Sequence, residues 1–489
     1  MAQRGRFILQ LAVATTVLAG CGLGVAAPPA RIQTGTDAKA FARSAASDIA
    51  RQTGADAGDL EAYIESQQAE LTDLARRRTA LPAGGGEPGA EPGAGPLTLP
   101  PSAQATVNAV DTLINADRIF AAIEESVRGA RKRIQLDLFM LGGRYGSRLA
   151  QAIEDRRQAG VDVRIVLDGH FAAMGPAHQQ AMSTATFLRD HQMPVRTFPL
   201  DSLIAPKGLA KASLIDHNKI VIADDTAYIG GANLIDVADT NHDLMFRIHG
   251  PVAAEISQWV DATFDKSTYP AIWSTGKAAK APPALPAPTY RPATAVPAGA
   301  NSRVALTRTD RTEHSTYDRL LARIKTSAKI DVGVFELDDE TLKAELINAK
   351  KRGAQVRILL DRHQMDHKYT GKKAPAGIPN WLAVRDFLAA GLPVHWYDPS
   401  LPFEEMHLKM AIFDDRVSVV GSTNFTTRAF LNYRETGIEV EGGQAVADLV
   451  AMFEADWRSH STPVTTLTAQ QRALAATIAF LNKGGIGWW

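Results

Sequence analysis

The segment His407–Glu435, HLKMAIFDDRVSVVGSTNFTTRAFLNYRE, decides which fold we expect for the rest of the chain. Its apolar runs MAIF and VSVV flank the polar DDR, a pattern that predicts a β-hairpin. His407 and Lys409 are two residues apart at the start of the hairpin, so their side chains are expected on one face of the strand. An imidazole and an ammonium on one surface suit a phosphate group.

The same pattern occurs 190 residues earlier, where His217 corresponds to His407. The text before each hairpin also repeats: RIFAAIEESVRGARK, RIQLDLFML, SRLAQAIEDRRQAG and VDVRIVLDG match YDRLLARIKTSAK, KIDVGVFEL, ETLKAELINAKKRG and AQVRILLDR. Such a match indicates an internal duplication. The paired positions are His217 and His407, Lys219 and Lys409, Asp224 and Asp414, Gly230-Gly231 and Gly421-Ser422, and Asn233 and Asn424.

Strands and helices alternate in each copy, which predicts an α/β fold with mostly parallel strands covered by helices. We expect the first unit over residues 108–276 and the second over 301–460, with a Pro- and Ala-rich linker at 277–300 and a C-terminal helix and tail at 461–489. A pseudo-twofold axis between the units would bring the two histidine motifs together into one shared site.

The N-terminus has the features of an export signal. Arginines precede an apolar run that ends in Leu18-Ala-Gly-Cys21, so residues 1–21 are expected to be a signal peptide whose cysteine is lipidated. The alternative is a plain signal peptide cut near Ala26 and Ala27, with Cys21 removed. Cys21 is the only cysteine, so no internal disulfide can form. A helical segment and a Gly/Pro-rich tether, 22–107, would then hold an exported protein at a bacterial membrane, facing the periplasm or the exterior.

Overall composition places limits on the function. The chain has 45% apolar and 22% charged residues, as an ordinary globular protein does. Lysine plus arginine equal aspartate plus glutamate at 53 each, and this zero net charge argues against a dedicated nucleic-acid binder.

The two motifs resemble those of the phospholipase D superfamily, including its cardiolipin synthase branch, over about residues 108–460. The resemblance implies two α-β-α units and cleavage of a phosphodiester through a covalent phosphohistidine. It assigns the nucleophile to His217 and the general acid to His407, a choice that the sequence alone does not make. No cofactor or metal is required by this scheme.

The resemblance also implies roles for the surrounding residues. Lys219, Lys409, Asn233 and Asn424 would bind the phosphate oxygens. Acidic residues would orient the imidazoles, Asp243 for His217 and Glu435 for His407. Two residues, instead of the usual one, separate Asn432 from Glu435, which puts the second assignment in doubt. Asp224 and Asp414 are expected to be structural and to close the hairpins.

The substrate is left open among three hypotheses. The expected anchor favours a phospholipid, whose phosphatidyl group would pass to water or to an alcohol. Basic clusters at 207–211 and 368–373 would instead suit a nuclease, although solvated loops account for them better. A non-catalytic binding lipoprotein is the third. His363 and His367 have a zinc-like spacing but follow a strand in a polar segment, so a loop is preferred, and His242 is a candidate site residue beside Asp243.

Overall fold

The computed structural model describes residues 104–168, 175–198, 215–267, 290–362, 379–398, 404–469, 471–472 and 475. The predicted lipidation site Cys21, the tether, both basic clusters, His363 and His367, and most of the predicted C-terminal helix lie outside these residues. None of the helices in the described part of the chain has the length and apolarity needed to cross a bilayer.

The first unit alternates strands and helices and then forms antiparallel strands. Its elements are β1 (Thr106–Ile114), α4 (Ala116–Gly129), β2 (Arg133–Leu138), α5 (Gly143–Gln158), β3 (Asp162–Asp168), α6 (Gly175–Asp190), β4 (Val195–Phe198), β5 (Lys219–Ala223), β6 (Thr226–Gly230), η2 (Asp236–Ala238), β7 (Asn241–His242), β8 (Leu244–His249) and α7 (Pro251–Lys266).

The second unit repeats this order. Its elements are β9 (Ser302–Thr309), α8 (Ser315–Thr326), β10 (Lys329–Val334), α9 (Glu340–Lys351), β11 (Gln355–Leu360), α11 (Trp381–Ala389), β12 (Val394–Tyr397), β13 (Glu405–Met406), β14 (Lys409–Phe413), β15 (Val417–Gly421), α12 (Thr427–Leu431), β16 (Glu435–Glu441), α13 (Gly443–Ser459) and β17 (Ser461–Pro463).

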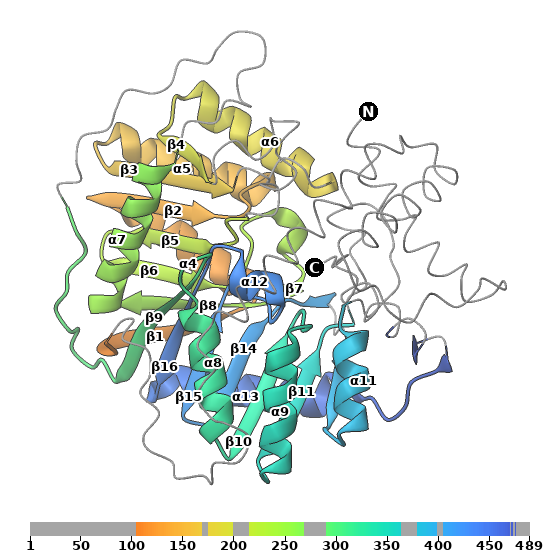
Figure 1. The fold of residues 1–489 in the computed structure, drawn as a ribbon. Helices are drawn as coiled ribbons and strands as arrows, with labels where there is room; N and C mark the ends of the chain where they lie inside the picture. Colours follow the sequence, from red (N-terminus) through yellow and green to blue (C-terminus); the bar gives the residue numbers. More distant parts are fainter. Residues whose placement is uncertain are drawn as a thin grey trace, which may run out of the picture.

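Fifteen of the described strands form a single sheet in the order β17-β12-β11-β10-β14-β15-β16-β9-β1-β8-β6-β5-β2-β3-β4 (Figure 1). The two units join at the antiparallel pair β1 and β9. From this pair, corresponding strands of the two units follow in the same order towards the two edges of the sheet. The expectation of mostly parallel strands is wrong. In this sheet only β2, β3 and β4, and likewise β10, β11 and β12, pair in parallel. Each of these strands is joined to its neighbour in the sheet through a helix, α5 or α6 in the first unit and α9 or α11 in the second.

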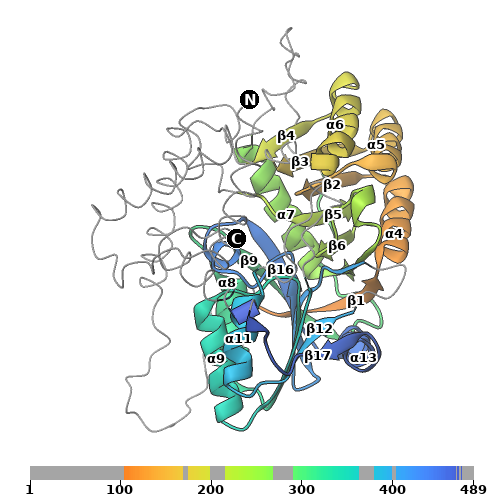
Figure 2. The same cartoon turned by 90° about the vertical axis from the view of Figure 1, so that its right-hand side faces the viewer.

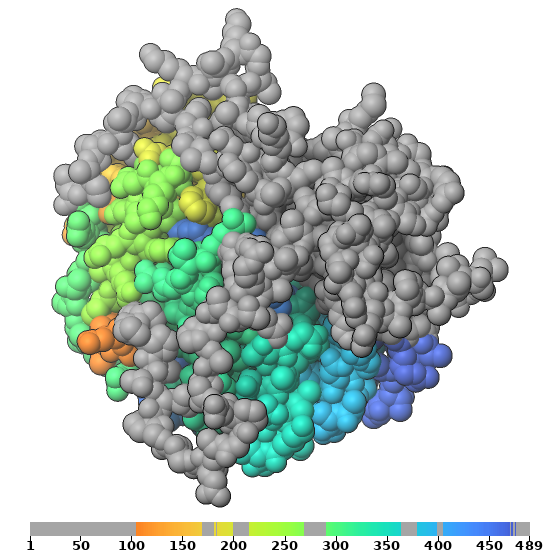
Figure 3. Space-filling view, viewed as in Figure 1, coloured from red at the N-terminus to blue at the C-terminus, as the bar shows by residue number. Residues whose placement is uncertain are grey.

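Helices cover the sheet on opposite sides in the two units. Figure 2 shows α4, α5 and α6 on one face of the first half and α8, α9 and α11 on the other face of the second half. Each group buries its own apolar core against its strands. A third core contains residues of α7, α13 and strands of both units, so the units are packed as one body. In the space-filling view the surface of α7 adjoins that of α8 (Figure 3).

Local sequence signals explain where the long helices stop. Gly160 follows α5 with φ +89° and Gly353 follows α9 with φ +96°, as expected for C-terminal caps. Part of the predicted linker lies against the first unit, since the Tyr290 carbonyl accepts a hydrogen bond of 3.0 Å from Arg133 Nη1 and its hydroxyl donates to Asp225. The turns of both hairpins form as predicted, between β5 and β6 and between β14 and β15.

Candidate active site

Each motif histidine lies two residues before the first strand of its hairpin, and the following lysine shares its face. Lys219 Nζ donates to the His217 carbonyl at 2.6 Å, and Lys409 Nζ donates to the His407 carbonyl at 2.7 Å. One aromatic ring contacts both side chains in each unit. The Phe139 ring centroid lies 4.8 Å from that of His217 and 5.0 Å from Lys219 Nζ. In the second unit the Phe335 ring centroid lies 4.9 Å from that of His407 and 5.0 Å from Lys409 Nζ. The histidine and the lysine therefore share one face of the chain in both units, as the alternation of side chains predicted.

The acidic residues pair with the histidines across the two units. His217 Nδ1 lies 2.9 and 3.1 Å from the two carboxylate oxygens of Glu435, and His407 Nδ1 lies 2.7 Å from Asp243 Oδ2. The predicted pairing of Asp243 with His217 and of Glu435 with His407 is therefore wrong. Both carboxylates do reach an imidazole, but each reaches that of the other unit.

Backbone pairing explains why the partners cross. The segment before His217 pairs in parallel with the segment before Glu435, with His217 N–H donating to the Arg434 carbonyl at 2.9 Å. The corresponding strand β13, before His407, pairs in parallel with β7, before Asp243, and His407 N–H donates to the His242 carbonyl at 2.8 Å. Each histidine thus lies beside the acid-bearing segment of the other unit, and the four residues form one shared site.

Two further carboxylates hold the residues that precede the histidines. Asp168 Oδ2 accepts the N–H of Asp216 at 2.6 Å, and Asp361 Oδ2 accepts that of Met406 at 2.7 Å. Asp168 is the last residue of the buried strand β3, and Asp361 directly follows the corresponding strand β11. Because each fixes the backbone next to a histidine, they are positioning residues that the sequence did not reveal.

Burial strongly changes the ionisation of the charged groups. It raises the pKa of Glu435 to about 8 and that of Asp243 to about 7. Burial lowers the pKa of Lys219 to about 7 and that of Lys409 to about 8. Burial and the charges of the two lysines and His407 hold the pKa of His217 well below its ordinary value. A neutral His217 at neutral pH follows from these surroundings.

Hydrogen bonding fixes the tautomer of His217. Its Nδ1 lies 3.2 Å from the Ser422 carbonyl as well as beside Glu435. A carbonyl only accepts, so Nδ1 carries the ring proton and Nε2 keeps its lone pair. The arrangement thus presents a basic, unprotonated nitrogen at His217.

The two motif asparagines have different surroundings. Asn424 Nδ2 donates to Glu336 Oε2 at 2.7 Å, and Asn233 is buried. The Oδ1 atoms of both asparagines have no hydrogen-bond partner in the described part of the chain. Glu336 follows Phe335, and Met140 takes the same place after Phe139. The expected role of both asparagines in binding phosphate stays a prediction.

The motif aspartates lie at the hairpin turns, at the far end of each first strand from its histidine. Asp224 accepts backbone N–H bonds of 2.8 to 2.9 Å from Arg131, Lys132 and Arg133, at the start of β2. Asp414 accepts backbone N–H bonds of 2.8 Å from Ala328 and Lys329, at the start of β10. Their carboxylates thus tie each turn to the start of a neighbouring strand, which agrees with the structural role expected for them.

Glycines allow the strands to come close behind the site. A Cβ on Gly421 would lie 2.5 Å from the Thr436 carbonyl oxygen, and a Cβ on Gly231 would lie 2.4 Å from Asp243 Oδ1. Both contacts are shorter than atoms tolerate. These glycines thus permit the backbone approach that places the two acids.

His242 takes part in a buried pair beside the site. Its Nε2 lies 2.9 Å from Asp456 Oδ2, and its Nδ1 lies 2.8 Å from Asn115 Oδ1. Among the residues that the structure describes, no group of three or more His, Cys, Asp and Glu side chains is arranged to hold a metal ion.

Comparisons with known proteins support the same family as the motifs. A family model described as "Cardiolipin synthase, PLD-like domain" matches residues 123–268 and 320–457. A cardiolipin synthase A of Pseudomonas putida strain F1 is 27% identical over 354 residues, which are 69% of this chain and 66% of that protein. The chain therefore spans about two thirds of that relative's length.

A cardiolipin synthase 1 of Bacillus anthracis is 23% identical over 389 residues, covering 75% of this chain and 69% of that protein. Among solved structures, phosphatidylserine synthase of Haemophilus influenzae aligns with a TM-score of 0.60 at 15% identity, over 78% of this chain and 96% of that one. This last likeness concerns the fold.

Proposed function

The chain belongs to the PLD-like domain family of cardiolipin synthases, and from this membership we propose that it transfers the phosphatidyl group of a phospholipid to an alcohol or to water. The crossed pairing of His217 with Glu435 and of His407 with Asp243 carries the proposal. It provides two largely buried imidazoles, each with its Nδ1 bound to a carboxylate of the other unit.

The first half of the reaction forms the covalent intermediate. Nε2 of His217 attacks phosphorus, the bond from phosphorus to the head-group oxygen breaks, and that oxygen takes a proton from Nε2 of His407. The neutral state that burial favours for His217 is the state that a nucleophile requires. The Nδ1 contact with Glu435 stabilises the positive charge that develops on the ring.

The second half returns the enzyme to its starting state. His407, now neutral, removes a proton from the acceptor hydroxyl, whose oxygen attacks phosphorus and breaks the bond to His217. Throughout, Lys219 and Lys409 face the non-bridging oxygens. Each ammonium group donates one N–H to a histidine carbonyl, and its other two N–H groups would bind the phosphate.

A lipid substrate is favoured over nucleic acid by the relatives. Proteins that match more than two thirds of the chain are named cardiolipin synthases. The balanced charge of the chain points the same way. A nuclease and a purely binding protein are thus less favoured, and the acceptor, water or an alcohol, stays open.

The experiment offers the chain without residues 1–21 phosphatidylglycerol vesicles and ethanol, with a chelator present. We expect phosphatidylethanol, and no product from His217→Ala or His407→Ala proteins whose circular dichroism matches the wild type. His191→Ala, an exposed histidine of the first unit, is the matched control and should keep full activity. Nicking of plasmid DNA in a parallel assay, with lipid left intact, would contradict the proposal.

A further inference from the structure

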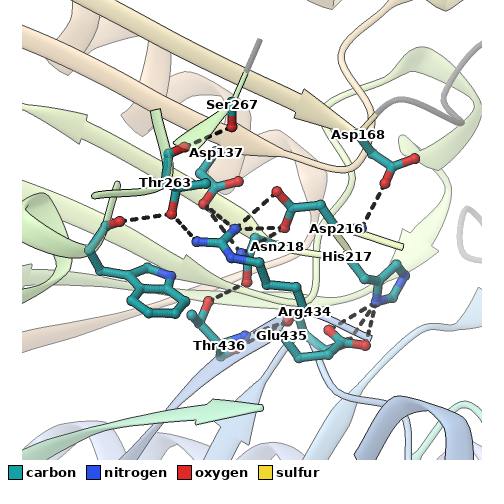
Figure 4. Close-up of polar contacts among 12 residues, drawn as sticks. Asp137, Asp168, Asp216, His217, Asn218, Thr263, Ser267, Arg434, Glu435 and Thr436 are labelled. Atoms are coloured by element: carbon teal, nitrogen blue, oxygen red, sulfur yellow. Dashed lines mark hydrogen bonds and ion pairs between the residues drawn. The ribbon is translucent and has the colours of Figure 1, made fainter. Parts of the chain in front are cut away.

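Arg434, the residue before Glu435, lies buried between the two units. Its Nη1 contacts Asp137 Oδ2 at 2.8 Å and both carboxylate oxygens of Asp216 at 2.9 Å, and its Nη2 donates to the Thr263 hydroxyl (Figure 4). Its guanidinium also lies over the Trp259 ring, 4.5 Å from the centroid. One arginine from the second unit therefore binds two carboxylates of the first.

The contacts of Arg434 fix both members of a catalytic pair. Asp216 directly precedes His217, and Arg434 directly precedes Glu435. The two are bridged by backbone as well as by side chains, since Arg434 N–H donates to the Ile215 carbonyl at 2.8 Å and His217 N–H donates to the Arg434 carbonyl at 2.9 Å. A shift of Arg434 would therefore move Glu435 relative to the ring of His217.

Asn218, on the other side of His217, is bound into the same cluster. Its Nδ2 donates to Asp216 Oδ1 at 2.8 Å, and its Oδ1 accepts from the hydroxyl of Thr436, the residue after Glu435, at 2.9 Å (Figure 4). The residues on both sides of His217 thus contact the residues on both sides of Glu435.

The equivalent positions around His407 have different chemistry. Met406 and Leu408 flank His407 and belong to the apolar core shared by the units. Gly333 takes the place of Asp137, since each lies opposite the third residue after its histidine. His242 takes the place of Arg434 and is bound to Asp456 instead. The charged cluster therefore exists at one histidine of the pair.

We propose that Arg434, with Asp216 and Asp137, is a positioning residue that sets the geometry and charge of the His217–Glu435 pair and so makes His217 chemically different from His407. The inference rests on the proposed function. The sites of the two units are nearly symmetric in their histidines, lysines and phenylalanines, so the difference between nucleophile and acid needs an asymmetric source. The Arg434 cluster supplies one.

The charges around His217 predict how the pKa of its ring changes when Arg434 is replaced. His217 is faced by Glu435 of β16, Lys219 of β5, Lys409 of β14 and His407. Asp216, which shares Arg434 with Asp137, directly precedes His217 in the chain. Burial raises the pKa of Asp216 well above its ordinary value, and Arg434 opposes that shift. Loss of the Arg434 fork would move its positive charge away from Asp216 and Asp137. Their carboxylates would then act more strongly on His217, which favours the imidazolium and raises the pKa of the ring.

The test compares Arg434→Lys with Arg357→Lys in the chain without residues 1–21. Lysine keeps the charge but loses the planar fork. Arg357 is the matched control, because its fork likewise binds two carboxylates, Asp331 of β10 at 2.6 and 2.7 Å and Glu454 of α13 at 2.6 Å. The readouts are kcat/KM for phosphatidyl transfer against pH and the ring ¹⁵N titration of His217 by NMR.

We expect Arg434→Lys to lower kcat/KM about 100-fold, the usual effect of misplacing a reacting group, and to move the His217 titration to higher pH. Arg357→Lys should leave both unchanged. A wild-type titration and rate in Arg434→Lys, or equal losses in Arg357→Lys, would overturn the inference.

Asp137→Asn is a second variant for the case in which Arg434→Lys fails to fold. This variant keeps the contacts of Arg434 with Asp216. It removes one negative charge and should move the His217 titration to lower pH, and an unmoved titration would again overturn the inference. If the wild-type protein transfers no phosphatidyl group, the proposed function fails, but the titration still tests the role of Arg434.

Discussion

Single residues at the site owe their chemistry to burial. Lys219 and Lys409 are 1% and 2% exposed, and the loss of hydration lowers the pKa of both ammonium groups into the neutral range. The two lysines can bind a phosphate as cations only while they are protonated. Phosphate binding at the site is therefore expected to depend on pH near neutrality. His217 has the opposite requirement, since its ring must be neutral to attack.

The pH profile of kcat/KM follows from these directions. Lys219 is charged below its pKa of about 7 and Lys409 below about 8, so activity should fall as pH rises through this interval. The acid limb should lie well below pH 6.5, the ordinary pKa of the imidazole, because the pKa of His217 is lowered.

The variant Lys219→Arg shows whether the lysines or the carboxyl groups cause the alkaline limb of the pH profile. The test is needed because Glu435 and Asp243 have pKa values of about 8 and 7, in the same interval. A guanidinium does not titrate there, so the alkaline limb should move from about pH 7 towards 8. An alkaline limb that stays in place would assign it to the carboxylates instead.

At the scale of elements, the sequence predicted what depends on local pattern. Both hairpins, the long helices with their glycine caps and the duplication are as expected, because alternation, periodicity and turn residues determine them. Sheet pairing depends on contacts distant in sequence. The alternation of strands and helices suggested parallel strands throughout, but each hairpin inserts antiparallel strands between β2 or β10 and the middle of the sheet.

Elements also explain the motif aspartates. Asp224 has φ +50° in a two-residue turn, and its carboxylate binds three backbone N–H groups at the start of β2. Asparagine tolerates this backbone conformation, so Asp224→Asn does not strain the turn. Its side-chain NH₂ would replace one accepting oxygen and face a backbone N–H donor, so at least one hydrogen bond is lost. We expect a loss of about 1–3 kcal/mol in the free energy of unfolding by urea, with kcat/KM of the folded protein unchanged.

Asp415→Asn is the control for this variant. Asp415 lies in the other turn, where its carboxylate binds Lys329 Nζ at 2.8 Å on the surface. Removing that exposed pair should cost only about 0–1 kcal/mol. Equal losses in the two variants, or a loss of activity in Asp224→Asn, would contradict a purely structural role for the Asp224 carboxylate.

At the scale of the whole molecule, the sequence identified the site residues but not their partners. Asp243 and Glu435 were found from their place after each motif, and the natural assumption paired each with the histidine of its own copy. The crossing arises because segments of both units pair around the shared core, which no pattern within one copy can indicate. The same holds for Arg434, whose carboxylate partners lie in the other unit. The lipid anchor at Cys21 stays a prediction.

The central claim is that the two units build one site by exchanging their carboxylates, and ring ¹⁵N NMR of His217 and His407 tests it most directly. Removing a carboxylate from an imidazole Nδ1 changes the shifts and the titration of that ring. We predict that Glu435→Gln changes the signals of His217 and that Asp243→Asn changes those of His407. If Glu435→Gln instead changed His407 and left His217 as in the wild type, the crossed site would be contradicted.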